Sequence, residues 1–186
     1  MVDLHTHTNF SDGIQTLEEL LNKANASQLK YLSITDHDCI DAYNEMKNIK
    51  DNIYTGKLIT GTELYFIQDG IFNELLGYKF DVDKISSSFM FDKNERKKQE
   101  LEFLEELYPK LINKGLKLLS KEEYINKINN SNTFAATECG REVLKLKENK
   151  EIINKYGIYD WRELFEIWID NKNSDIIPSI PQIGNT

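Results

Sequence analysis

The order of strand and helix patterns over the first 80 residues is the feature that most constrains the fold. Alternating or continuous apolar segments predict strands, and apolar residues at helical spacing predict helices. The predicted strands cover residues 2–6, 30–35, 57–66 and 70–80, and the predicted helices cover 16–28 and 41–49. A capping box from Thr16 to Glu19 begins the first helix, and Gln68-Asp69-Gly70 forms the predicted hairpin turn. The order β-α-β-α-β-β predicts the opening of an α/β layer or barrel.

The pattern becomes helical from about residue 81. Helices are predicted over 93–114, from Ser120, over 136–149 and over 160–170. We expect Pro109 to kink or split the first of them, because proline cannot donate the helical hydrogen bond. The aromatic and leucine stripe of the last helix is interpreted as core and comprises Trp161, Leu164, Phe165 and Trp168. The predicted organisation is an α/β part over 1–80, a helical insertion over 81–175 and an extended tail over 176–186.

Composition limits the classes of partner. The formal net charge of −8 argues against non-specific binding to a nucleic-acid backbone, so a phosphorylated substrate needs a local positive centre such as bound metal ions. The chain contains no apolar run of about 18 residues and no secretory signal, which predicts no membrane partner. Cys39 and Cys139 are far apart, which favours a reduced, cytoplasmic protein.

The three histidines of the chain fall close to predicted strand ends. His5 and His7 lie two residues apart in "DLHTHTNFSD", so both side chains point to one face of a strand. Asp12 follows in the next loop, and His37 follows the second strand in "ITDHD". Glu63 lies towards the end of the third strand. Because reactive groups gather at the carboxyl ends of strands in such folds, we expect these side chains to converge.

Imidazole and carboxylate ligands without thiolates suit Zn, Mn or Fe. A cluster of such ions activates water and neutralises the charge that develops on a phosphoester, so this pattern predicts phosphoester hydrolysis. Asp36 and Asp38 are interpreted either as partners that orient the imidazoles or as caps of a strand end. Cys39 is interpreted as a small buried apolar residue rather than as a ligand.

Four motifs in order resemble the polymerase-and-histidinol-phosphatase (PHP) family of metal-dependent phosphoesterases. These motifs are "DLHTHTNFSDG", "LSITDHD", "ITGTEL" and "LLGY". The resemblance implies a distorted (β/α)7 barrel with two to three divalent ions of Mn, Fe or Zn. It also implies that the first five ligands are His5, His7, Asp12, His37 and Glu63. The later helices resemble the insertion of a branch that includes nucleoside 3′,5′-bisphosphate phosphatases and 5′→3′ exonucleases.

The chain departs from the family pattern at three places. Glu74 stands where the family usually has histidine, so it is either a substitute ligand or an exposed strand residue. The segment "ATECGRE" lacks the histidine and proline of the family's insertion, which leaves Glu138 and Arg141 at that position, the arginine being interpreted as solvated. No histidine follows His37, so the last family motifs are absent. We therefore expect an incomplete barrel, whose open edge favours a homo-oligomer.

The leading functional hypothesis is hydrolysis of phosphate esters of nucleotides or short oligonucleotides. In this hypothesis Asp12 and His37 bind the outer ion, lie closest to the leaving oxygen and are the catalytic residues, while His5, His7, Glu63 and Glu74 complete the metal site. No substrate-binding residue is identified. One alternative is a catalytically impaired module that binds metal or a partner. The other is a histidinol-phosphate phosphatase.

Overall fold

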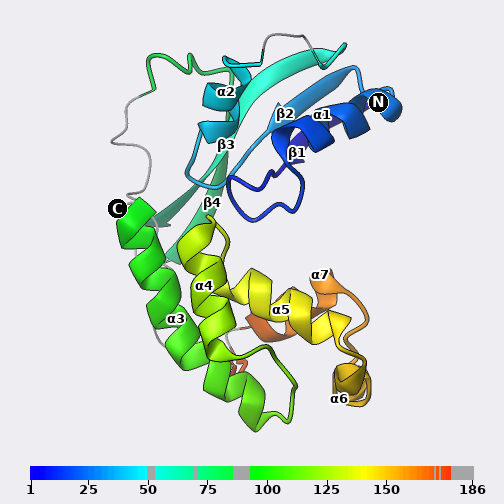
Figure 1. Ribbon diagram of the computed structural model, residues 1–186, viewed down its shortest axis with the longest axis vertical. Coiled ribbons are helices and arrows are strands. Elements are labelled where there is room, and N and C mark those ends of the chain that lie inside the picture. The colour runs from blue at the N-terminus through cyan, green and yellow to red at the C-terminus, as the bar shows by residue number, and fades with distance from the viewer. Residues whose placement is uncertain (50–52, 69–70, 86–92, 170, 172, 177–186) are drawn as a thin grey trace. The chain divides into compact units, whose positions relative to one another are not determined.

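The computed structural model describes the chain except residues 50–52, 69–70, 86–92, 170, 172 and 177–186 (Figure 1). The described residues form two compact units, the first containing residues 1–96 and 131–133 and the second containing 97–130 and 134–176. Each unit has its own apolar core. The predicted hairpin residues Asp69 and Gly70 lie outside the described part.

A four-stranded sheet in the order β1-β2-β3-β4 forms the first unit (Figure 1). The strands of the sheet are β1 (Val2–Thr6), β2 (Tyr31–Ile34), β3 (Lys57–Gln68) and β4 (Ile71–Tyr78). The first unit also contains the helices α1 (Leu17–Ala26) and α2 (Asp41–Met46). The first three strands are parallel, and β4 pairs with β3 in the antiparallel direction. The β-α-β-α-β-β order predicted from the sequence is confirmed.

Helix α1 begins at the predicted capping box. The Thr16 hydroxyl accepts the Glu19 amide at 3.2 Å, and the Glu19 carboxylate accepts the Thr16 amide at 2.8 Å. The apolar face of this helix, with Leu17 at 0% exposure, packs with Leu32 and Ile34 of β2. This core covers one face of the sheet, and polar side chains lie on the other face.

The register of β3 places Glu63 level with the ends of the neighbouring strands. The β2–β3 ladder ends at Ile34 opposite Thr60, and a single further bridge pairs His37 with Glu63. Glu63 was expected towards the end of a strand over 57–66, whereas β3 continues to Gln68. The strand continues because it has an antiparallel partner, β4, beyond the point where β2 stops.

The sheet curls into a half-barrel. The Tyr78 hydroxyl of β4 donates to the Leu4 carbonyl of β1 at 2.8 Å, although two strands separate them in the sheet. Three strand spacings of about 4.8 Å in a flat sheet exceed the reach of a tyrosine, so the strands must curve towards one another. The predicted α/β fold with an incomplete PHP-type barrel is confirmed.

The second unit is helical, as predicted. Its segments are α3 (Lys93–Asn113), which begins in the first unit, α4 (Lys121–Asn130), α5 (Ala135–Lys145), η2 (Lys147–Asn149), α6 (Lys150–Lys155), α7 (Trp161–Leu164) and η3 (Phe165–Ile169). Helix α3 continues through Pro109, so the prediction of a split is wrong. Leu107 and Leu111, on either side of the proline, are both buried in the same core, which holds the helix together across it.

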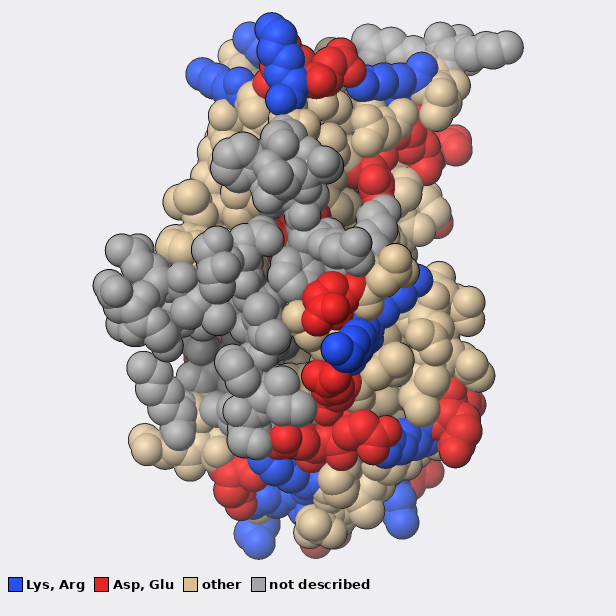
Figure 2. Space-filling model, turned by 90° about the vertical axis from the view of Figure 1, so that its left-hand side faces the viewer, with Lys and Arg blue, Asp and Glu red and all other residues tan. Residues whose placement is uncertain are grey.

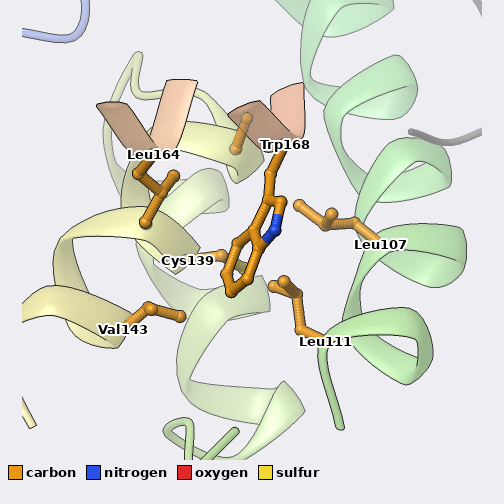
Figure 3. A pocket seen from close by; sticks show the side chains of 8 residues that line it. Leu107, Leu111, Cys139, Val143, Leu164 and Trp168 are labelled. Atoms are coloured by element: carbon orange, nitrogen blue, oxygen red, sulfur yellow. The ribbon is translucent and has the colours of Figure 1, made fainter. Parts of the chain in front are cut away.

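Trp168 lies at the centre of that core (Figure 3). Figure 3 shows its indole beside a small apolar cavity, and the labelled residues around it are Leu107, Leu111, Cys139, Val143 and Leu164. The predicted core role is confirmed for Leu164 and Trp168, while the side chains of Trp161 and Phe165 lie outside the described part. Of the predicted tail, Ile176 is buried in this core and 177–186 are not described.

Within the described part of the chain, every helix is too short or too polar to cross a membrane.

Candidate metal centre

The two histidines of the first motif face the same side of the sheet. Thr6, which lies between them, turns its hydroxyl away to donate to the Ser33 carbonyl at 2.8 Å. The rings of His5 and His7 lie with their centroids 5.1 Å apart. The alternation of side chains along β1, continued to His7 directly after the strand, therefore brings both imidazoles to one place, as predicted.

One carboxylate oxygen, Oε2 of Glu63, lies among all three imidazoles. Its distances are 2.9 Å to His5 Nε2, 3.2 Å to His7 Nε2 and 3.5 Å to His37 Nδ1. Glu63 is 4% exposed. Burial alone would raise the pKa of its carboxyl, but the adjacent imidazoles, His7 first, outweigh burial and lower that pKa.

Asp12 defines a second group of donors. Its Oδ1 lies 2.9 Å from His7 Nδ1 and 3.7 Å from His37 Nε2. His7 therefore faces Glu63 with one ring nitrogen and Asp12 with the other. Burial opposes its protonation, yet the two carboxylates outweigh burial and raise the pKa of His7 to about 10. Burial dominates at His37 and lowers its pKa to about 3.

A buried carboxylate holds the loop that carries Asp12. Asp36 accepts hydrogen bonds from the Thr8 amide at 2.7 Å, the Thr8 hydroxyl at 2.5 Å and the Ser11 hydroxyl at 2.7 Å. Gly13 lies against the His7 and Thr8 backbone, where any Cβ would overlap. These contacts anchor the loop, a role that differs from both interpretations offered for Asp36, orientation of an imidazole and capping of a strand end.

The segment that carries His37 is held against β3. The Asp38 amide donates to the Glu63 carbonyl at 2.8 Å, and the Asp38 carboxylate accepts the Tyr65 amide at 3.1 Å. Asp38 has a φ of +47°, a left-handed conformation that aspartate tolerates better than most residues. The Arg96 guanidinium donates to the His37 carbonyl at 3.0 Å.

Sequence reasoning missed Tyr65 and Arg96. The Tyr65 ring stacks on the His37 imidazole at 4.5 Å and 10°, and its hydroxyl lies 3.2 Å from His37 Nε2. The signal for Tyr65 was available, because it follows Glu63 by two residues on a strand and so shares its face. Arg96 lies 59 residues from His37 in the chain and carried no such signal.

Glu74 is exposed, and in the β3–β4 register it lies opposite Tyr65. It therefore shares the face of Glu63, although, among the residues that the structure describes, it belongs to neither donor group. Glu138, in the second unit, pairs with Lys127 at 2.8 Å and with Arg141 at 2.9 Å. Cys39 is buried, and among the described residues it too belongs to neither donor group.

The donors fit divalent cations. The two groups are His5, His7 and Glu63, and His7, Asp12 and His37, and within each the ligand atoms all lie within 4.8 Å of one another. Two donors bound about 2.1 Å from one ion at roughly 90–110° lie about 3.0–3.4 Å apart, close to the separations found here. His7 Nδ1 is buried and makes no hydrogen bond with a described residue, although a carboxylate oxygen is 2.9 Å away. A shared cation explains this arrangement better than a hydrogen bond does.

The PHP domain profile matches residues 3–159. Two curated relatives are 5′-3′ exoribonucleases. The one from Haemophilus influenzae is 30% identical over 107 residues, which are 56% of this chain and 39% of the relative. The one from Escherichia coli K12 is 29% identical over 106 residues, which are 56% of this chain and 36% of the relative. The chain thus spans less than half the length of either relative.

Two solved structures share the fold. An amidohydrolase from Chromobacterium violaceum, described with bound sulfate and no metal, has a TM-score of 0.68 at 17% identity and covers 98% of this chain and 59% of its own. A candidate metal-dependent phosphoesterase from Bifidobacterium adolescentis has a TM-score of 0.59 at 21% identity. The alignment with it covers 96% of this chain and 59% of the phosphoesterase chain. With the profile matching most of its length, the chain belongs to the PHP domain family.

Proposed function

We propose that the protein hydrolyses phosphate esters with the help of divalent cations. The observation that carries the proposal is the pair of donor groups that share His7, with Glu63 Oε2 among three imidazoles. When bound, such cations activate water for attack on phosphorus and neutralise the charge on the phosphoester. Two groups support two ions, and Glu74 is our candidate for contributing to a third.

The proposed ligands form two groups, one for each cation. His5, His7 and Glu63 would hold one cation, and Asp12 and His37 would hold the next; a neutral imidazole offers one lone pair, so His7 can serve either group but not both at once. We assign Asp12 and His37 to the position beside the leaving oxygen, where the carboxylate would orient the reacting groups and the imidazole would hold the cation.

We propose nucleotides or short oligonucleotides as the substrates. The two curated relatives named as 5′-3′ exoribonucleases support this choice. The net charge of −8 repels phosphates, and Figure 2 shows the described Lys and Arg side chains next to Asp and Glu on the face in view. A phosphate would then be attracted by the cations rather than by a broad basic surface.

Metal analysis and a hydrolysis assay test the proposal. Purified protein incubated with Mn²⁺ and freed of excess ion is expected to retain about two ions per chain, and His7→Ala, which removes a donor from both groups, is expected to retain none. The same pair of proteins is then assayed on a nucleoside 3′,5′-bisphosphate and on a 5′-phosphorylated RNA oligonucleotide. We expect Mn²⁺-dependent release of phosphate or nucleotides by the wild type and at least a hundredfold loss in His7→Ala.

Asp3→Asn is the matched control, because Asp3 is an exposed carboxylate of the same strand that lies outside both donor groups. It should keep the metal content and the rate of the wild type. Protein that retains metal but hydrolyses neither substrate would support the alternative of a metal-binding interaction module. Protein that retains no metal would contradict the proposal.

A further inference from the structure

We propose that Tyr65 is a positioning residue that fixes the imidazole of His37 in the orientation needed to bind the second cation. This inference rests on the proposed function, since it concerns the donor group of His7, Asp12 and His37. Tyr65 is not itself a candidate ligand, and it acts through His37.

Two contacts from one side chain restrict the two ways in which the imidazole can move. The ring of Tyr65 lies parallel to that of His37, with an interplanar angle of 10° and a centroid distance of 4.5 Å, which limits tilting of the imidazole plane. In the metal-free protein the Tyr65 hydroxyl lies 3.2 Å from His37 Nε2, which limits rotation within that plane. Nε2 also faces Asp12 Oδ1, at 3.7 Å, so the hydroxyl must release this nitrogen when a cation binds there, whereas the ring stack can persist.

Tyr65 can restrain His37 because its own backbone is tied to the same segment. Its amide donates to the Asp38 carboxylate at 3.1 Å, and the Asp38 amide donates to the Glu63 carbonyl at 2.8 Å. His37 and Glu63 themselves form a parallel bridge. The side-chain stack is therefore built on a backbone connection between β3 and the His37 segment, so the two rings cannot drift apart independently.

Two other neighbours, His7 and Glu63, contact the imidazole in less restrictive geometries. His7 lies 4.5 Å from His37 between ring centroids but is tilted by 52°, so it does not form a parallel stack. Glu63 Oε2 is 3.5 Å from His37 Nδ1, which is long for a hydrogen bond. Among these neighbours, Tyr65 supplies the only parallel ring contact. Removal of the Tyr65 ring should therefore allow the imidazole to rotate out of the cation-binding orientation.

Tyr65→Leu and Tyr65→Phe separate the two contacts, and Phe66→Leu is the matched control. Tyr65→Leu removes the stack and the hydroxyl, whereas Tyr65→Phe keeps the stack. Phe66 is the next residue of β3 and points to the other face of the sheet, so its replacement changes the strand but not the site.

The first measurement is NMR of the histidine rings in the metal-free protein, which has three histidines in all. We expect the nuclear Overhauser effects between the ring protons of His37 and His7, whose centroids lie 4.5 Å apart, to keep their wild-type intensity in Tyr65→Phe and Phe66→Leu and to weaken in Tyr65→Leu. Unchanged intensities in Tyr65→Leu would overturn the proposal, whether or not the protein hydrolyses anything.

The second measurement is calorimetric titration with Mn²⁺. We expect Tyr65→Leu to weaken the weaker class of sites about tenfold and Tyr65→Phe, which keeps the stack, to leave it unchanged within about twofold, with the tighter class unchanged in both variants. Equal weakening of both classes in Tyr65→Leu, or weakening by Phe66→Leu to the same extent, would overturn the positioning role. Absence of any Mn²⁺ binding by the wild type contradicts the proposed function instead, and the ring spectra then decide on Tyr65 alone.

Discussion

The carboxylate of Asp36 is 1% exposed and accepts three hydrogen bonds from a single loop. Two of the donors are hydroxyl groups and one is a backbone amide, and all three come from residues between the first histidines and Asp12. These three donors share one buried acceptor. Removal of the carboxylate would leave all three without a partner, so Asp36 contributes strongly to the order of the loop.

We predict that Asp36→Ala destabilises the first unit by about 3 kcal/mol, since it leaves buried donors of Thr8 and Ser11 without an acceptor. The free energy of unfolding is measured by urea titration followed by circular dichroism. Hydrogen exchange of the peptide over 7–13 should accelerate more than that of α1. Asp3→Ala, an exposed carboxylate of β1, is the control and should change stability by less than about 0.5 kcal/mol. Equal effects of the two replacements would contradict the anchoring role.

At the scale of elements, β3 approaches β2 closely at Gly61. A Cβ added at this position would overlap the Ser33 hydroxyl and meet the Thr35 methyl group at 2.8 Å. Gly61 also lies two residues before Glu63 on the same face of the strand. The absence of a side chain at Gly61 therefore permits the close contact between β2 and β3 and, with it, the placement of the Glu63 carboxylate.

Gly61→Ala is predicted to destabilise the first unit by about 1–3 kcal/mol, because overpacking forces the strands apart. The same replacement should lower the Mn²⁺ affinity, since it moves Glu63 away from the imidazoles. Gly77→Ala is the matched control on β4, where the nearest atoms to an added Cβ lie at 3.8 Å, an ordinary contact distance. Thermal denaturation and Mn²⁺ titration of the two variants check the prediction, which fails if both behave alike.

Most elements and most donors could be predicted because they depend on local periodicity. Alternation that starts in β1 and continues to the residue after it places His5 and His7 on one face, and the capping box at Thr16 begins α1 where expected. The continuation of β3 past Glu63 could not be predicted, because it depends on pairing with β4. The continuation of α3 through Pro109 depends likewise on core contacts of Leu107 and Leu111. The stacking of Tyr65 on His37 joins segments 28 residues apart, and local patterns do not encode the distance between them.

At the scale of the whole molecule, the described residues form two apolar cores. One centres on α1 and β2 and the other on α3, α5 and the segment of Trp168. Each unit contains one of the two cysteines, and both are buried and form no disulfide with a described residue. Cys139 belongs to the core of the second unit and therefore offers a chemical reporter for that core.

Cys139 is 1% exposed, and burial raises the pKa of its thiol to about 12. An ordinary thiol is half ionised near pH 8.5, whereas a pKa of about 12 leaves roughly one thiolate in three thousand at that pH. Because the thiolate is the reactive form, labelling of the native protein requires opening of the second core. A Cys39→Ser background restricts the measurement to Cys139.

In that background, a disulfide reagent at pH 8.5 should label Cys139 at least about a thousandfold more slowly without urea than in urea. Leu107→Ala removes a fully buried side chain of the same core and should cost about 2–5 kcal/mol. If opening controls labelling, that loss accelerates the reaction by at least about 30-fold, because 1.4 kcal/mol corresponds to a factor of ten. Gly61→Ala, which perturbs the first unit, should leave the Cys139 rate unchanged. Equal acceleration by both replacements would show that the two cores open as one cooperative body, contrary to the separation on which this prediction depends.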